Sequence, residues 1–243
     1  MTWANRFRLL LGLVVVVAIV LGATLILSQR ETLVASRSAS VKAVSYSVGS
    51  DYAGTVVSQQ ANQGDSVKKG QPLLTIQSAT LLRDQTSHAG VPKSTAYKVS
   101  TAGMMTLVAT QPGIVSRIGA HVGGFVSAGS ALATVDREGS LYVLADFRLD
   151  PYDFSRVEKG AVVDLILPNQ QRLAGTVTRI DVTTTGGKAD ASIEVHSDQL
   201  VTGTHDGLVA PGTPMTANLH LRDNGPLAGL KEGFVGLLEK MGL

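Results

Sequence analysis

The chain has 243 residues, of which only 16% are charged, and its formal net charge is +2. Because aromatic residues are few and lysines and arginines form no cluster, this composition excludes a basic nucleic-acid-binding protein. The lack of cysteine excludes disulfides, thiolate metal ligands and a cysteine nucleophile. The 26 glycines and the high apolar content predict a mainly β protein with one strongly apolar segment.

That apolar segment lies near the N-terminus. Residues 9–27 read LLLGLVVVVAIVLGATLIL without a charge, and a membrane-spanning helix needs about 20 such residues. No cleavage site of small residues follows the run. We therefore expect residues 1–30 to form an uncleaved transmembrane anchor of a single-pass protein at the cell membrane, with the remaining chain extracytoplasmic. Residues 31–45, rich in Ser and Ala, are expected to be a linker.

A repeat follows this predicted linker. The sequence AGTVVSQQANQGDSVKKGQPLLTI, from Ala53, recurs 59 residues later as PGIVSRIGAHVGGFVSAGSALATV, from Pro112. Each copy is predicted to form strands separated by glycine turns, and glycine suits turns that need a positive φ. A generic glycine-rich hairpin is the alternative interpretation. The matched positions are Gly54/Gly113, Val56/Val115, Gly64/Gly123, Val67/Val126, Gly70/Gly129, Leu73/Leu132, Thr75/Thr134 and Ile76/Val135.

The segments after each copy differ from one another. Residues 79–105 show no apolar heptad and contain interrupting glycines and a proline, so no long coiled coil is expected there. Residues 139–223 alternate as several short strands, which predicts a small β-barrel or sandwich. Residues 224–243 are predicted to form an amphipathic helix, packed on the barrel, contacting a transporter or lying on the membrane surface. Its apolar face would hold Leu227, Leu230, Phe234, Leu237, Leu238 and Met241.

The spacing G-x-V followed by G-D-x-V-K-K-G-Q-x-L, from Gly54 to Leu73, resembles half of a biotinyl/lipoyl-type barrel-sandwich domain. The second copy is similar to the other half. Two halves (46–78 and 106–138) around an insertion (79–105), after an anchor and before a barrel, resemble the membrane fusion or periplasmic adaptor proteins of haemolysin-secretion (HlyD) type. The short insertion departs from the long hairpin of many adaptors, which puts docking to an outer-membrane channel in doubt.

This resemblance implies a lipoyl-like barrel-sandwich hybrid plus a β-barrel, and an adaptor for efflux or secretion. It implies assembly with an inner-membrane transporter permease, with the ABC type favoured, and homo-oligomerisation. A cell-wall or structural anchor protein without a transporter is one alternative. A biotin or lipoyl carrier is another, but Lys93 and Lys98 lack the sequence context of a modified lysine.

No pattern indicates an enzyme, a cofactor or a metal site. The five histidines, His88, His121, His196, His205 and His220, show no metal-ligand spacing. Neither a G-x-S-x-G nucleophile elbow nor a phosphate-binding glycine loop occurs. His205-Asp206 is interpreted as a solvated loop. Asp150 and Asp153 flank Pro151 and are interpreted as a turn that opens a helix.

Overall fold

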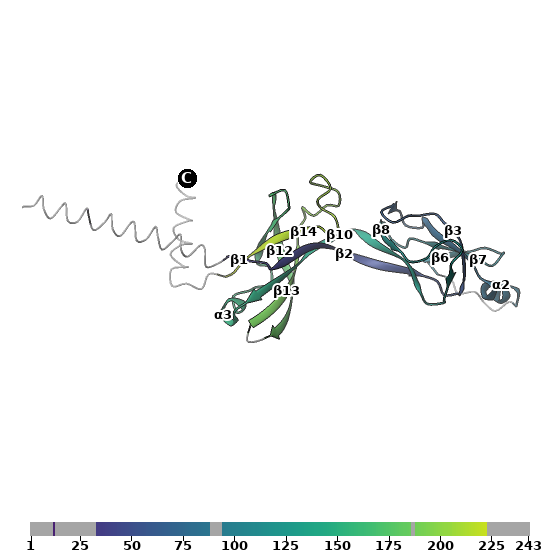
Figure 1. The fold of residues 1–243 in the computed structure, drawn as a ribbon, viewed down its shortest axis with the longest axis horizontal. Coiled ribbons are helices and arrows are strands. Elements are labelled where there is room, and N and C mark those ends of the chain that lie inside the picture. Colours follow the sequence, from purple (N-terminus) through teal and green to yellow (C-terminus); the bar gives the residue numbers. More distant parts are fainter. Residues whose placement is uncertain (1–11, 13–32, 88–93, 186–187, 223–243) are drawn as a thin grey trace, which may run out of the picture. The chain divides into compact units, whose positions relative to one another are not determined.

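The computed structural model describes residues 33–87, 94–185 and 188–222, together with Gly12. The predicted anchor and the predicted C-terminal helix lie outside the described residues, apart from Gly12. No helix in the described part is long and apolar enough to cross a membrane. The chain is mainly β, as predicted (Figure 1), and divides into two compact units. The first contains the residues up to Val41, Tyr142–Leu200 and the residues from Leu208; the second contains Lys42–Leu141 and Val201–Gly207.

Strand pairings in the first unit close into a ring. The order is β14, β11, β12, β13, β10 and β2, and β2 then pairs with β14. Inward side chains alternate along each strand, as in β13, and bury large residues such as Phe147, Leu165 and Ile193. The elements are β1 (Leu33–Ala35), β2 (Ser38–Gly49), β10 (Ala131–Leu149), α3 (Pro151–Phe154), β11 (Val162–Ile166), β12 (Arg172–Thr185), β13 (Lys188–His196) and β14 (Pro214–His220).

The linker predicted for residues 31–45 is wrong for its described part. Strand β1 and most of β2 occupy residues 33–45, and β1 pairs with the end of β14 from Leu33 to Ala35. Serine content suggested a flexible segment, but Ala39 and Val41 recur at the period of two that a half-buried strand requires, and both are buried.

The second unit contains two sheets around one apolar core. One sheet has the order β6, β7, β5, β3 and β9; in the other, the first residues of β10 pair with β8, which pairs with β4. The elements are the end of β2, β3 (Gly54–Gln59), β4 (Ser66–Val67), β5 (Pro72–Gln77), α2 (Ala79–Thr86), β6 (Tyr97–Val99), β7 (Met104–Val108), β8 (Gly113–Ile118), β9 (Phe125–Val126) and the start of β10.

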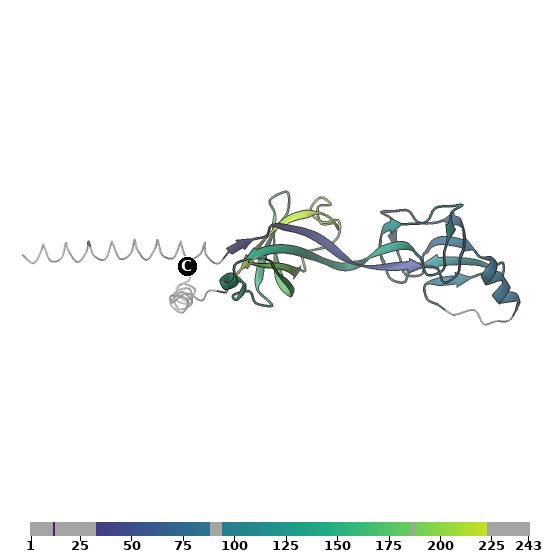
Figure 2. The same ribbon diagram turned by 60° about the horizontal axis from the view of Figure 1, so that its bottom comes forward.

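Strands β2 and β10 contribute residues to both units, and each is drawn as a continuous ribbon (Figure 2). The boundaries therefore fall inside strands, at 41/42 and 141/142. Sequence analysis placed these boundaries at 45/46 and 138/139. It missed the observed positions because a boundary inside a continuous strand is not marked by a turn.

Candidate partner-binding surfaces

The two copies of the repeat are intertwined in the second unit. The Gly64 N–H donates to the Val115 carbonyl, and the equivalent Gly123 N–H donates to the Val56 carbonyl, both at 2.8 Å. Strand β3 of the first copy pairs with β9 of the second, and β8 of the second pairs with β4 of the first. Each copy thus supplies a turn and a short strand to the other. Neither copy can complete its own hydrogen-bonded edge alone.

The repeated glycines serve two different purposes. Gly64, Gly70, Gly123 and Gly129 have φ values of 93°, 81°, 85° and 80°, which confirms the positive φ expected at these turns. Gly54 and Gly113 are conserved between the copies for a different reason, which is close packing of strands. A Cβ at Gly54 would overlap the carbonyl oxygen of Gln77, and one at Gly113 would overlap that of Asp136. Gln77 and Asp136 are themselves repeat equivalents.

The repeated apolar residues form one core. Val56, Val67, Leu73 and their equivalents Val115, Val126 and Leu132 all belong to a single buried cluster. Sequence analysis missed three further equivalent pairs in this cluster, Ala61/Ala120, Val48/Leu107 and Leu74/Ala133. The signal for all three was present, because each pair is separated by the same 59 residues. The alanine pair is an identity within the aligned stretches.

Two tyrosine–carboxylate contacts attach the insertion to this core. Tyr97 of β6 hydrogen-bonds to Asp51, and Tyr52 hydrogen-bonds to Asp84 of α2. Burial, followed by the hydrogen bond to Asp51, raises the pKa of Tyr97 to about 12. Burial and then the bond to Asp84 also raise the pKa of Tyr52. The two contacts therefore link the insertion to residues 51 and 52.

Helix α2 is short and has a defined start. The Ser78 side chain accepts a hydrogen bond from the Leu81 N–H and caps the helix, which has 8 residues. Within the described part of residues 79–105, α2 is the only helix. Lys98, considered above as a carrier lysine, lies exposed on strand β6.

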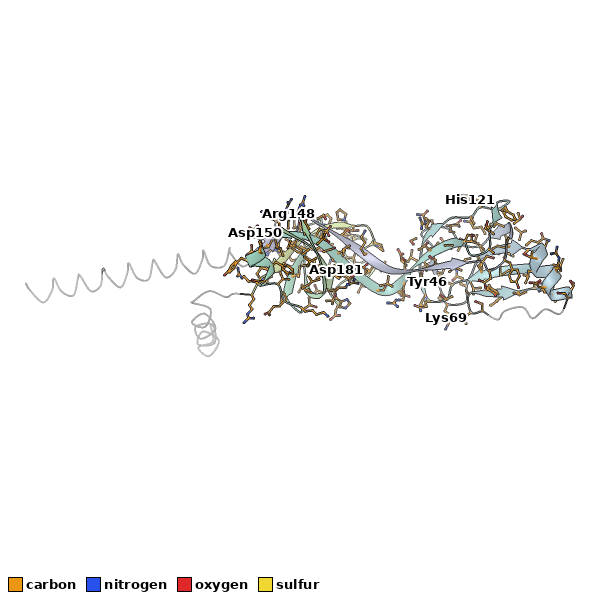
Figure 3. All side chains as sticks on the ribbon, turned by 90° about the horizontal axis from the view of Figure 1, so that it is seen from below. Tyr46, Lys69, His121, Arg148, Asp150 and Asp181 are labelled. Atoms are coloured by element: carbon orange, nitrogen blue, oxygen red, sulfur yellow. The ribbon has the colours of Figure 1, made fainter. Side chains whose placement is uncertain are left out.

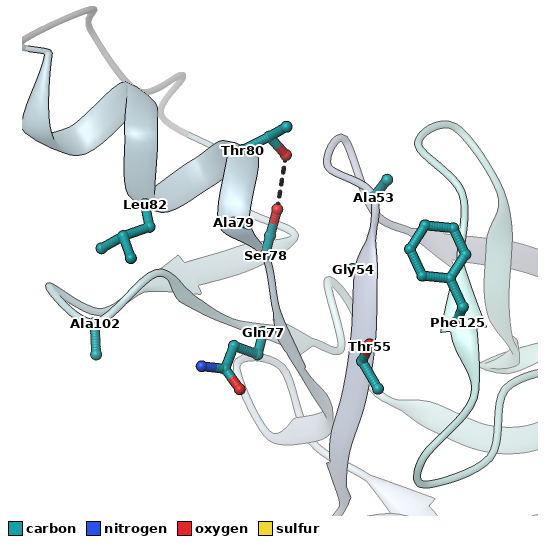
Figure 4. A pocket seen from close by; sticks show the side chains of 10 residues that line it. All are labelled: Ala53, Gly54, Thr55, Gln77, Ser78, Ala79, Thr80, Leu82, Ala102 and Phe125. Carbon is teal, nitrogen blue, oxygen red and sulfur yellow. Dashed lines mark hydrogen bonds between the residues drawn. The ribbon is translucent and has the colours of Figure 1, made fainter.

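A pocket of about 440 Å³ opens beside α2 (Figure 4). Phe125 stands on one side of the strand that carries Gly54 and Thr55, and Leu82 of α2 stands on the other. None of the described residues that line the pocket is charged. They are Ala53, Gly54, Thr55, Gln77, Ser78, Ala79, Thr80, Leu82, Ala102 and Phe125. The lining is therefore uncharged and combines apolar with neutral polar residues.

In the first unit, Arg156, which follows α3, binds Arg222, which follows β14. The Arg156 side chain is buried, and its Nε donates to the Arg222 carbonyl at 2.7 Å, while the Arg222 N–H donates back to the Arg156 carbonyl at 3.1 Å. Arg156 also lies 3.6 Å from Asp153 and stacks over the Tyr152 ring. The helix starts at Pro151, as the sequence predicted, and Asp150 is its N-cap residue. These contacts fix Arg222, the last residue that the structure describes.

Charged side chains of the first unit pair with one another on its surface. Arg148 lies 3.9 Å from Asp190, Lys188 lies 3.2 Å from Asp150, and Arg179 lies 3.0 Å from Asp181. Figure 3 labels Arg148, Asp150 and Asp181 among the side chains. Exposed pairs of this kind contribute little stability, about 0–1 kcal/mol each. They give the barrel a mixed-charge outer surface.

The described histidines do not converge on a site. His220 pairs with Asp164 at 2.9 Å across β14 and β11, and His196 lies 3.5 Å from Asp198. His205 and Asp206 both have positive φ in a turn. No group of three or more metal-ligating residues occurs among the described residues.

Comparisons with known proteins bear on this arrangement of units. No protein-family model matches the sequence, and no curated protein matches it. Solved structures do match. ZneB from Cupriavidus metallidurans is 16% identical with a TM-score of 0.58, and the match covers 79% of this chain and 99% of that one. The periplasmic adaptor protein EmrA is 11% identical with a TM-score of 0.51 and the same coverage.

A third match is MacA from Actinobacillus actinomycetemcomitans, 12% identical with a TM-score of 0.57, covering 79% of each chain. This chain has the fold of the periplasmic adaptor, or membrane fusion, proteins. The resemblance noted from the repeat is confirmed at the level of fold. The adaptor fold includes both units, because the matched 79% exceeds what either unit alone could supply.

Proposed function

We propose that the chain is the adaptor subunit of an efflux or secretion transporter and not an enzyme. The observation that carries this proposal is the adaptor fold, which spans 79% of the chain and 99% of ZneB and of EmrA. EmrA is a periplasmic adaptor protein. Both units take part in this match. An adaptor of this kind acts by holding other proteins in place, so its function resides in surfaces.

The proposed location is the cell membrane, with a single-pass anchor at residues 1–30 and both units extracytoplasmic. The apolar run of residues 9–27 supports the anchor. Because β1 begins at Leu33, only residues 28–32 separate the run from the first unit. Five residues span at most about 18 Å. The first unit would therefore stay closer to the bilayer than the linker predicted for residues 31–45 would have required.

The proposed partner is a transporter permease, with the ABC type favoured, bound through the anchor and the barrel region 141–222. A membrane-proximal unit can reach a permease directly, whereas the short insertion offers no long hairpin for a distant channel. A homo-oligomer is also proposed, since adaptors that form rings use heterologous contacts that close by rotation. We also propose that the chain belongs to the haemolysin-secretion subgroup of adaptors. The predicted C-terminal helix and its predicted contacts are part of the same proposal.

The direct test is affinity purification of the full chain from detergent-solubilised membranes, followed by mass spectrometry. We expect a polytopic permease to co-purify in a stable ratio. Recovery of cell-wall material without a permease would favour the structural-anchor alternative instead. The intact mass of the same sample checks the carrier alternative, because a biotinyl or lipoyl group on Lys93 or Lys98 would add its own mass.

A second experiment locates the permease contact. Charge reversals across the barrel, such as Arg148→Glu and Lys188→Glu, should reduce permease recovery. A Gly/Ser replacement within the insertion should leave it unchanged. That replacement should cover residues 88–95 and spare Tyr97, because Tyr97 is buried in the core. If the loop replacement alone abolished permease recovery in a folded protein, the proposed interface would be wrong.

A further inference from the structure

The chain enters and leaves the barrel of the first unit at the same end. Leu33 of β1 and His220 of β14 are register partners, so the first and last strands of the unit meet there. Strand β11 begins at this end too, because Val163 faces Leu219, the residue before His220. Figure 1 shows β1 and α3 at this end of the unit. We call it the chain-exit end.

Three large apolar or aromatic side chains are exposed at the chain-exit end. Leu33 is 44% exposed, Val162 is 49% exposed, and Tyr152 of α3 is 66% exposed. Leu33 projects outward with His220, because register partners share one face of a sheet. Val162 also projects outward, because the next residue of β11, Val163, is buried. We call Leu33, Tyr152 and Val162 the exit rim.

The charged groups around the exit rim are already paired with one another. A carboxylate lies within hydrogen-bonding or ion-pair distance of each of three basic side chains, two arginines and a histidine. The pairs are Arg222–Glu158 at 2.8 Å, Arg156–Asp153 at 3.6 Å and His220–Asp164 at 2.9 Å. Lys159 is also exposed there, and the stem of a lysine can lie along apolar surface while its charge reaches headgroups. The exit rim thus combines apolar surface with little net charge.

The length of the chain before Leu33 limits what can cover the exit rim. Only residues 28–32 separate Leu33 from the apolar run, and five residues span at most about 18 Å. The headgroup layer on each side of a bilayer takes up about 5–7 Å of that length. If the run spans the membrane, about 12 Å or less remains between Leu33 and the headgroups. That gap is about the diameter of one helix, so a folded domain does not fit beneath Leu33.

We propose that the exit rim rests on the lipid headgroups, where Leu33, Tyr152 and Val162 enter the membrane surface and orient the first unit. This rests on the membrane anchor of the proposed function and adds a contact that needs no protein partner. Tyrosine is typical of the boundary between lipid and water, because its ring is apolar and its hydroxyl is polar. Leucine and valine gain stability there by leaving water.

The contact is too small to hold a free protein on a membrane. Three part-exposed side chains amount to about a few hundred Å² of surface at most. The anchor, however, already supplies attachment and keeps the exit rim at a high effective concentration beside the surface. The contact therefore needs only to select one orientation of the first unit among those that the short connection allows.

Fluorescence quenching by lipids tests the contact in phosphatidylcholine vesicles that contain the full chain and no permease. Because the sequence lacks cysteine, Val162→Cys and Asn169→Cys each provide a single site for a small fluorophore. Val162 begins β11 and the exposed Asn169 follows its end, about 20 Å away. With lipids brominated close to the headgroup, we expect quenching at Val162→Cys to be at least threefold greater than at Asn169→Cys.

Serine substitutions test whether the apolar side chains make the contact. Leu33→Ser together with Tyr152→Ser should reduce quenching at Val162→Cys at least twofold. Val201→Ser removes another apolar side chain, which is 55% exposed and lies in the second unit, and should leave quenching unchanged. Circular dichroism checks that each variant is folded. If the double variant does not fold, Leu33→Ser alone provides the same comparison.

Equal quenching at Val162→Cys and Asn169→Cys would overturn the proposal, and so would quenching that the serine substitutions leave unchanged. A photoreactive maleimide on Val162→Cys in native membranes should give lipid adducts, and a protein adduct would show that a protein covers the rim instead. Flotation of the parent chain with the vesicles is measured first. Its failure would reject the anchor and the contact that depends on it, whereas flotation without quenching would reject the exit-rim contact alone.

Discussion

Replacing Gly54 or Gly113 by alanine should destabilise the second unit far more than replacing Gly64 or Gly123. At Gly54 the new Cβ would overlap the Gln77 carbonyl oxygen of β5 and would lie 2.8 Å from the Ile76 side chain. At Gly113 it would overlap the Asp136 carbonyl oxygen of β10. A carbonyl in a sheet cannot rotate away without breaking the strand pairing. The neighbouring strand must therefore shift.

The magnitudes separate the two classes of glycine. Overpacking a core lowers the free energy of unfolding by about 1–3 kcal/mol. Because the obstacle here is rigid backbone, we expect Gly54→Ala and Gly113→Ala to lower it by about 3 kcal/mol or more. At Gly64 and Gly123 no described atom lies within 4 Å of the Cβ position, so alanine incurs only the left-handed backbone strain of about 1–2 kcal/mol. For a chain of this size, 1 kcal/mol corresponds to about 2–4 °C in Tm.

Thermal unfolding of the four variants in detergent, followed by circular dichroism, measures this difference. We expect the Tm of Gly54→Ala and of Gly113→Ala to fall by about 6–12 °C. The two decreases should be similar, because the carbonyl oxygens that each Cβ would overlap belong to equivalent residues of the repeat. The Tm of Gly64→Ala and Gly123→Ala should fall by about 2–8 °C, and by less than that of the first pair measured under the same conditions. If Gly54→Ala cost no more than Gly64→Ala, the reasoning from strand proximity would be refuted.

Three further predictions concern folding. Removing residues 1–30 should give a soluble, folded β protein, whereas removing 1–45 should unfold the barrel because it deletes β1 and most of β2; gel filtration and circular dichroism distinguish these outcomes. Fragments 46–78 and 106–138 should be unfolded alone and associate when mixed, and cooperative unfolding of either one alone would contradict the intertwined pairing. Because the fold raises the Tyr97 pKa above that of the unfolded chain, its contribution is complete below about pH 10 and is lost as pH rises towards 12. Urea midpoints between pH 8 and 12 should show this loss, and Tyr97→Phe should weaken the dependence.

Local spacing made the second unit predictable. The copies are alike because each requires glycine at the same turns and apolar side chains at the same inward positions, as Gly64 and Val67 illustrate. The sequence could not separate a glycine needed for φ from one needed for close approach. Gly54 has no unusual φ, and its constraint comes from β5, which is paired with it across the sheet.

Non-local pairing explains what the sequence analysis did not predict. The barrel closes where Ser40 faces Pro214, and β1 is a strand because His220 faces Leu33. No local feature of residues 33–45 indicates that the strand they pair with lies so far along the chain. The composition of this segment therefore suggested a linker. The exposure of Phe125 was missed for a related reason. A phenylalanine in a strand pattern is read as core, and only comparison with Ser66, the equivalent residue of the first copy, indicates that Phe125 is not needed there.

Under the proposed adaptor function, partner choice would be encoded outside the repeated core. Val56 and Val115, or Leu73 and Leu132, fill equivalent places, so a change there alters the fold of both halves before it alters a surface. The paths of the two copies separate after their last common strand. The first continues through Gln77 into α2 and the insertion, and the second continues through Asp136 along β10 into the first unit. The two equivalent halves thus lead into two different segments of the chain. An adaptor with this architecture could change the binding surface of one segment while its core and the other segment stay the same.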